Sequence, residues 1–219
     1  LDKFQAAFAK AVELCRDNLL ASLGYSILAA TLALPVALVL GHAIARWRHG
    51  WFLEMLCVLP LAAPAILFGI GNIAVWNGTW TYAFYTSGGM VVLLYIGRFL
   101  AFPTLVSAGA VASLDRELEQ AAELAGAGPV RRMTRIVAPA LVPSLIGGWV
   151  LMFVLAMREL DAAILVPAAN DTVMFRMFNA VHFGRDDFVA ALALLILFVT
   201  IVPGVLWRLF SGKELEVLP

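Results

Sequence analysis

Charge and cysteine are both scarce in this sequence. Asp, Glu, Lys and Arg together make up only 14% of its 219 residues, and 15 basic residues balance 15 acidic ones. A protein that binds nucleic acid usually carries an excess of positive charge, so the composition indicates no nucleic-acid partner. The two cysteines, Cys15 and Cys57, lie far apart in the chain and favour neither a disulfide framework nor a metal site.

Short catalytic and nucleotide-binding motifs are also missing. The sequence contains no Gly-x-Ser-x-Gly elbow of a serine hydrolase and no His-Glu-x-x-His zinc motif. It contains no Gly-x-x-x-x-Gly-Lys-Ser/Thr loop that would cradle the phosphates of ATP. We therefore predict that the chain is not an enzyme, has no catalytic residues, and binds no cofactor or metal of its own.

Long apolar stretches, in contrast, are abundant. Hydrophobic residues make up 63% of the chain, more than a soluble fold of this length can bury in one core. A helix crosses the hydrocarbon core of a bilayer with about 20 apolar residues, because its own hydrogen bonds satisfy the backbone there. The sequence thus predicts an all-α integral membrane protein with five spans, at residues 19–45, 52–76, 90–112, 141–167 and 188–209.

The second of these stretches is interrupted by residues that break helices. Pro60, Pro64, Gly69 and Gly71 all lie inside it. Such breaks are tolerated in a span where neighbouring helices satisfy the freed backbone groups, and they often line a transport pathway.

Basic residues near the spans predict the orientation of the chain. Lys and Arg in short loops favour the cytoplasm. Eight of them lie on the side that holds the loop 113–140 and the tail 210–219, and five lie on the other side. We therefore place that loop and the tail in the cytoplasm, and the N-terminus outside. Apolar residues at helical spacing predict an amphipathic helix over residues 1–18 on the outer face.

The cytoplasmic loop 113–140 has the signals of two short helices joined by a corner. Ser113 or Asp115 can cap the first helix, since either side chain can accept a bond from a free backbone N–H group. Gly126 is the expected left-handed terminator of that helix. Pro129 begins the second helix at a position where its missing N–H does no harm.

The spacing within this loop resembles the EAA loop of permeases from ABC importers. The positions that keep the spacing of that loop are Gln120, Ala121, Ala122, Gly126, Ile136 and Pro139. Two positions depart from the pattern: Gln120 replaces the usual Glu, although Glu119 lies beside it, and Ala138 replaces the usual Leu. The resemblance implies a MetI-like transmembrane type-1 domain over residues 19–209, with about five transmembrane helices and a cytoplasmic coupling helix.

The resemblance also implies partners. In that family the EAA helix seats in a groove of an ATP-binding cassette subunit, which binds ATP and Mg. The residues expected to dock are Gln120, Ala121, Ala122 and Gly126, while Ile136 and Pro139 would hold the exit of the loop. A substrate-binding protein outside, and a second permease copy or fused half within the lipid of the bacterial inner membrane, complete the expected assembly. The alternative for the loop is a plain turn between two spans.

Ionisable residues inside the predicted spans are the candidates for a pathway or gate. A charge at the middle of a span costs about 2.5–3.5 kcal/mol on insertion scales, so it needs a partner or a wet cavity. Arg98 in the third span and Glu159 and Asp161 in the fourth lie at similar expected depths. We expect Arg98 to pair with Glu159 or Asp161, either as an outer gate or as a static pair that fixes helix register.

The sequence favours ferric iron as the substrate. The stretch 157–166, in which Glu159-Leu160 precedes an apolar run, resembles the same region of Fbp-type ferric-iron permeases. Thiamine, polyamine and phosphonate permeases share much of this region, so each of these substrates stays open. A channel or scaffold without an ATPase is the alternative from another class, and it would leave the spacing of the inner loop unexplained.

Overall fold

The computed structural model describes residues 2–211, and every regular element in this range is helical. The longer helices are α1 (Asp2–Arg46), α2 (Gly50–Ala62), α3 (Ala65–Trp76), α5 (Gly88–Phe99), α6 (Ala101–Ser113), α10 (Val142–Met157), α11 (Val173–His182) and α12 (Asp186–Ser211). The shorter elements are α4 (Tyr82–Tyr85), α7 (Arg116–Leu124), α8 (Pro129–Arg132), the π-helical η1 (Met133–Val137), α9 (Ala138–Ala140) and the 3₁₀ turns η2 (Ala163–Leu165) and η3 (Pro167–Asp171). The all-α membrane fold predicted from the sequence is therefore confirmed.

Two helices are long and apolar enough to cross a membrane without a break. They run over Phe8–Arg46 within α1 and over Asp186–Leu209 within α12. Helix α1 as a whole joins the predicted outer helix to the first span in one continuous helix of 45 residues. At 1.5 Å per residue this helix is about 67 Å long, so much of it extends beyond the hydrocarbon. Residue 1 and most of the predicted tail, residues 212–219, lie outside the described range.

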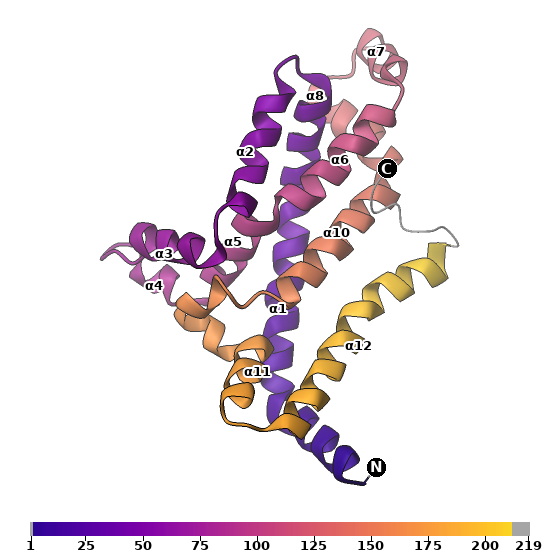
Figure 1. The fold of residues 1–219 in the computed structure, drawn as a ribbon. Helices are drawn as coiled ribbons and strands as arrows, with labels where there is room; N and C mark the ends of the chain where they lie inside the picture. The colour runs from indigo at the N-terminus through magenta and orange to yellow at the C-terminus, as the bar shows by residue number, and fades with distance from the viewer. Residues whose placement is uncertain (1, 212–219) are drawn as a thin grey trace.

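The predicted second span is not one straight helix. It consists of α2 and α3, whose axes differ in direction by 100°. Ala63 and Pro64 between them are extended, with ψ of 135° at both. The residue before a proline is pushed away from helical geometry, which accounts for the break at this point. The chain thus turns sideways after α2, and α3 projects from the bundle (Figure 1).

The third stretch also bends, and the fourth ends early. The axes of α5 and α6 differ by 47° near Leu100, where Pro103 lacks the N–H that would bond to Phe99. Helix α10 ends at Met157, so the prediction of a span through residue 167 is wrong for its last ten residues. Glu159 causes part of this departure, since its carboxylate accepts a bond at 2.8 Å from the backbone N–H of Ala162. Five spans are reached only if each bent helix pair counts as one.

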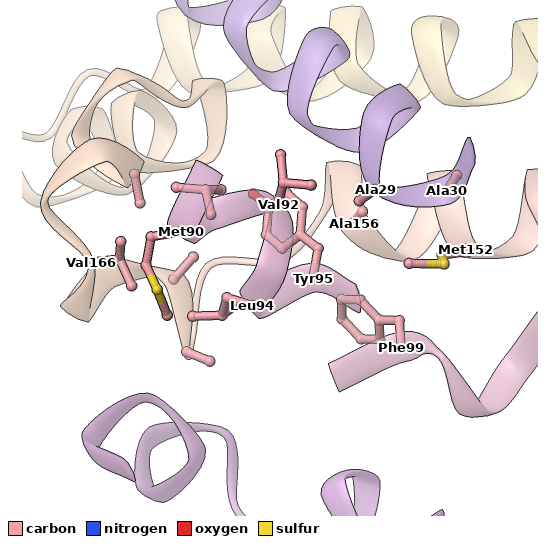
Figure 2. Close-up of a cluster of buried hydrophobic side chains, with 14 of the residues drawn as sticks. Ala29, Ala30, Met90, Val92, Leu94, Tyr95, Phe99, Met152, Ala156 and Val166 are labelled. Atoms are coloured by element: carbon pink, nitrogen blue, oxygen red, sulfur yellow. The ribbon is translucent and has the colours of Figure 1, made fainter. Parts of the chain in front are cut away.

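The core of the bundle forms around α5. Its buried side chains, among them Met90, Leu94 and Tyr95, pack with residues of α1, α10 and the segment after α10 (Figure 2). Alanines of α1 such as Ala29 and Ala30 are fully buried in this cluster, and their small size lets the helices approach closely. Seven large apolar side chains of α12, among them Phe198 and Leu209, are in contrast exposed, as expected for a surface that faces lipid.

The two ends of the bundle hold different elements. One end carries the turn from α1 to α2 together with α7 and α8 (Figure 1). The opposite end carries the start of α1, the helix α11 and the start of α12, which runs from there toward the first end. The turn after α1 and the loop 113–140, both predicted to be cytoplasmic, therefore lie together, while the side of the membrane on which they lie stays a prediction.

Gly41 sets the closest approach between α1 and α6. A Cβ atom at this position would lie 2.6 Å from Cβ of Ser107 and 2.8 Å from the backbone N of Ala108. Because backbone cannot move aside as a flexible side chain can, we predict that Gly41→Ala lowers the free energy of unfolding by about 1–3 kcal/mol. Thermal unfolding in detergent measures this loss.

Gly24 provides the matched control on the same helix. A Cβ atom there would meet nothing within 4 Å. Gly24→Ala should leave the midpoint temperature of thermal unfolding unchanged or raise it, because alanine is a better helix former than glycine. Equal midpoints for the two variants would contradict the close packing at Gly41.

Candidate functional site: the loop after α6 and a buried ion pair

The loop after α6 begins with a capped helix. The side chain of Asp115 accepts a hydrogen bond at 2.9 Å from the backbone N–H of Glu117, so Asp115 is the N-cap of α7. Ser113, the other predicted cap, instead donates to the carbonyl of Ala110 within α6. Glu117 and Glu119 lie in the first turn of α7, where negative charge suits the positive end of the helix.

A sharp corner follows α7. Gly126 has φ of +82°, the left-handed conformation that favours glycine. The N–H of Gly126 bonds to the carbonyl of Glu123, and the N–H of Ala127 bonds to that of Ala122, both at 2.9 Å. These two bonds form a Schellman motif, and Pro129 then starts α8 in its first turn. The corner predicted from the sequence is therefore present.

The outer surface of this corner carries the predicted docking residues. Gln120, Ala121 and Gly126 are exposed and Ala122 is half-buried. Three apolar side chains that the sequence analysis did not single out are also exposed here: Leu118, Leu124 and Val130. Leu124 stands out at 90% exposure. An exposed apolar patch at a polar end of a membrane protein is typical of a protein contact surface.

The exit of the loop is anchored by a residue that the spacing did not indicate. Val137 is fully buried, and it packs with Leu38 of α1, Val111 of α6 and Leu141. Ile136 beside it is only half-buried, and Pro139 within α9 is exposed. The sequence shows that residue 137 is apolar, but it does not show which side of the helix faces the core.

Ion pairs connect the loop to itself and to α1. Glu119 contacts His42 Nε2 at 2.7 Å and Arg46 at 2.9 Å, and Arg46 also donates to the carbonyl of Leu114 at 2.8 Å. Within the loop, Arg132 of α8 pairs with Glu123 of α7. Burial of the Glu119 carboxyl opposes its ionisation, but the hydrogen bonds and charges of His42 and Arg46 outweigh burial and lower its pKa. Glu119 is therefore a carboxylate at neutral pH.

The second candidate site is a buried ion pair between α5 and the segment after α10. Arg98 Nε lies 3.4 Å from Glu159 Oε2, and Glu159 is only 8% exposed. The guanidinium of Arg98 also lies 5.8 Å from the centre of the Phe99 ring. Asp161, the other partner considered for Arg98, is exposed, and no ion pair joins it to Arg98. Of the two acids, Glu159 is thus the one that meets Arg98.

The two members of this pair differ in how fully their polar atoms are bonded. The Glu159 carboxylate is held from the other side by the N–H of Ala162, whereas the Arg98 Nη1 atom is buried without a hydrogen-bond partner. A buried guanidinium with an unused donor is costly and gains from any acceptor that comes within reach. Residues 2–211 contain no group of three or more His, Cys, Asp or Glu that could hold a metal ion.

Known proteins similar to this chain are transport permeases. The putrescine transport system permease protein PotI of Escherichia coli (strain K12) is 28% identical over 215 residues, which is 92% of this chain and 76% of that protein. The putative ferric transport system permease protein FbpB 1 of Haemophilus influenzae is 27% identical over 163 residues, 74% of this chain and 26% of that protein. Further relatives are named for sulfate and 2-aminoethylphosphonate transport.

A solved structure shows the same fold. A chain in the crystal structure of a bacterial alginate ABC transporter, in complex with an alginate-bound periplasmic protein, superposes with a TM-score of 0.68 at 16% identity. The match covers 98% of this chain and 90% of that one. Residues 21–213 match the family described as binding-protein-dependent transport system inner membrane component, which includes nearly all of the described bundle. The chain therefore belongs to this family of inner-membrane permeases of ABC importers.

Proposed function

We propose that this chain forms the translocation pathway of an importer and couples uptake to ATP hydrolysis in a separate ATP-binding cassette subunit, which holds ATP and Mg. The exposed corner between α7 and α8 carries this proposal. It lies at one end of the bundle (Figure 1). Its backbone is fixed by the Schellman bonds, and small and apolar side chains are exposed on it. A rigid, apolar and shallow surface suits a partner that approaches closely.

The other partners follow from the two ends of the bundle. We place the docking site of a substrate-binding protein at the end that carries α11; the structure of the bacterial alginate ABC transporter is likewise a complex with a periplasmic protein. A second permease copy or a fused half would complete the pathway, as the resemblance to EAA-loop permeases implies. This arrangement puts the loop 113–140 and the C-terminus in the cytoplasm and the N-terminus outside, as the basic residues favour.

Alternating access is the mechanism that this assembly supports. ATP closes the ATPase dimer, the corner at Gly126 moves with it, and the spans change from inward-open to outward-open. The bends at Leu100 and Pro64 give the spans points at which their segments can change angle. Hydrolysis then resets the assembly.

Ferric iron is the substrate that we propose first. The stretch around Glu159-Leu160 resembles ferric-iron permeases, and the Haemophilus ferric permease aligns with 74% of this chain. Putrescine is the second candidate, because the Escherichia coli putrescine permease aligns with 92% of it. Both substrates are cations, so the charge of the pathway does not separate them.

Uptake by cells that lack and then regain this gene distinguishes these candidates. We expect radiolabelled ferric citrate to enter only when the gene is restored, and radiolabelled putrescine to enter equally in both strains. The reverse pattern would replace iron by a polyamine, and no gene-dependent uptake of either would remove both substrates from the proposal.

The docking proposal predicts that the ATPase is lost when the corner is made bulky and charged. In a variant with Ala122→Glu and Gly126→Asp, the carboxylates would occupy the strip that the partner needs. We expect an ATP-binding subunit to co-purify with the unmodified permease from native membranes and to fall to background with this variant. Fluorescence-detected gel filtration verifies that the permease is still folded.

Gly184→Asp is the matched control for this variant. Gly184 also has a positive φ, of +64°, and open space around its Cβ position, but it lies at the opposite end of the bundle. The Gly184→Asp variant should retain the ATPase at the level of the unmodified protein. An ATPase that stays bound to the corner variant would contradict the docking proposal.

The gate proposal predicts different effects on stability and on transport. Glu159→Gln leaves Arg98 charged and unpaired, which should cost about 3–5 kcal/mol of stability. The double variant Arg98→Met with Glu159→Met should recover most of that stability, because neither charge remains buried. If the pair is a gate, the double variant should still be unable to couple ATP hydrolysis to uptake. Normal coupling of ATP hydrolysis to uptake in the double variant would mean that the pair only fixes the register of the helices.

A further inference from the structure

Glu119 differs from the other acidic residues of α7 in where its side chain lies. Glu117 and Glu123 are exposed, whereas the Glu119 side chain is only 13% exposed. Gln120 and Ala121, which follow it directly, are exposed on the surface of the corner. Glu119 thus lies on the side of α7 that faces the bundle, away from the surface available to a partner.

Two residues of α1 hold this carboxylate. His42 Nε2 lies 2.7 Å from Glu119 Oε2, and Arg46 Nε donates to Glu119 Oε1 at 2.9 Å. Both oxygens are therefore occupied by groups one helical turn apart, on the last turns of α1. Charge-assisted bonds of this kind are about twice as strong as neutral ones and fix direction as well as distance.

Arg46 extends the link to the start of the loop. Its Nη2 atom donates to the carbonyl of Leu114 at 2.8 Å, one residue before the N-cap of α7. The planar guanidinium thereby joins the entry of the loop and the first turn of α7 in a single fixed geometry. Among the residues that the structure describes, no other ion pair connects α7 with α1.

The position of α1 makes this link consequential. Helix α1 packs against α5, α6, α10 and α12, so it contacts the bundle on several sides. The loop is otherwise joined to the bundle through its two ends, after α6 and at the cluster around Val137. A displacement of α7 would reach α6 through Leu114 and Asp115, whereas it reaches α1 directly through the two hydrogen bonds of Glu119.

We propose that Glu119 is a positioning residue of the coupling loop, which fastens α7 to the cytoplasmic end of α1 through His42 and Arg46, so that a displacement of α7 moves α1. The proposal rests on the proposed docking of the corner to an ATPase. In this proposal α1, which spans the whole bundle, receives the movement of α7 directly, in addition to the movement that passes through the two ends of the loop.

Two spin labels test the link in the full-length permease in lipid nanodiscs. In a background with Cys15→Ser and Cys57→Ser, which removes the two free native thiols, Arg48→Cys and Glu117→Cys place labels at exposed positions beside each end of the link, on the α1 side and on α7. We expect one narrow distance distribution in the parent protein. Glu119→Gln keeps the size of the side chain and removes its charge. It should broaden the distance distribution at least about twofold, because the coupling energy of groups joined by such bonds corresponds to about a tenfold change or more in an equilibrium constant.

Matched variants make the outcome specific. Glu123→Gln removes a carboxylate from the same helix whose partner lies inside the loop, and it should leave the distribution narrow. Arg46→Gln should broaden it as Glu119→Gln does, and the two changes together should add little, since each breaks the same link. A narrow distribution in both Glu119→Gln and Arg46→Gln would overturn the proposal.

The ATPase subunit separates this proposal from the docking on which it rests. Glu119→Gln leaves the exposed strip intact, so the co-purified amount of ATPase should stay within about twofold of the parent, while ATP-driven uptake into proteoliposomes falls about tenfold. The probes for uptake are ferric citrate and putrescine. Loss of the ATPase from Glu119→Gln would contradict the positioning role, whereas absence of an ATPase from the parent would contradict the docking itself.

Discussion

In hydrocarbon a backbone amide has no water to bond with, and a charge has no solvent to stabilise it; the described structure follows from these two constraints. The first explains why every regular element between residues 2 and 211 is helical and why the bends fall at prolines such as Pro64 and Pro103, next to neighbouring helices. The second explains why Arg98 meets Glu159 inside the bundle.

The end of the bundle with the α7–α8 corner is where we propose that the chain contacts its ATPase. There the chain can use capping, left-handed glycine and ion pairs, all of which are costly inside the membrane. Asp115 and Gly126 fix the shape of the α7–α8 corner, and Glu119 bonds α7 to α1. These contacts hold the corner in one arrangement, with the apolar Leu124 exposed on its surface.

Local chemistry in the sequence was sufficient to predict some of these features. The N-cap and the glycine corner depend on residues within ten positions of each other, and α12 is an uninterrupted apolar run, so both were predictable. The end of α10 at Met157 was not, because hydropathy does not distinguish an apolar helix from the buried irregular segment that follows. The partnership of Glu119 with His42 and Arg46 was also missed, since 73 or more residues separate them and only the fold brings them together.

The proposed contact between the corner after α7 and an ATP-binding subunit can be tested with a photo-crosslinking amino acid in place of Ala121 in native membranes. We expect a covalent adduct that mass spectrometry identifies as an ATP-binding cassette subunit, and no such adduct when the probe replaces the exposed Phe183 at the other end. Adducts from position 121 with lipid or with a second permease alone would contradict it.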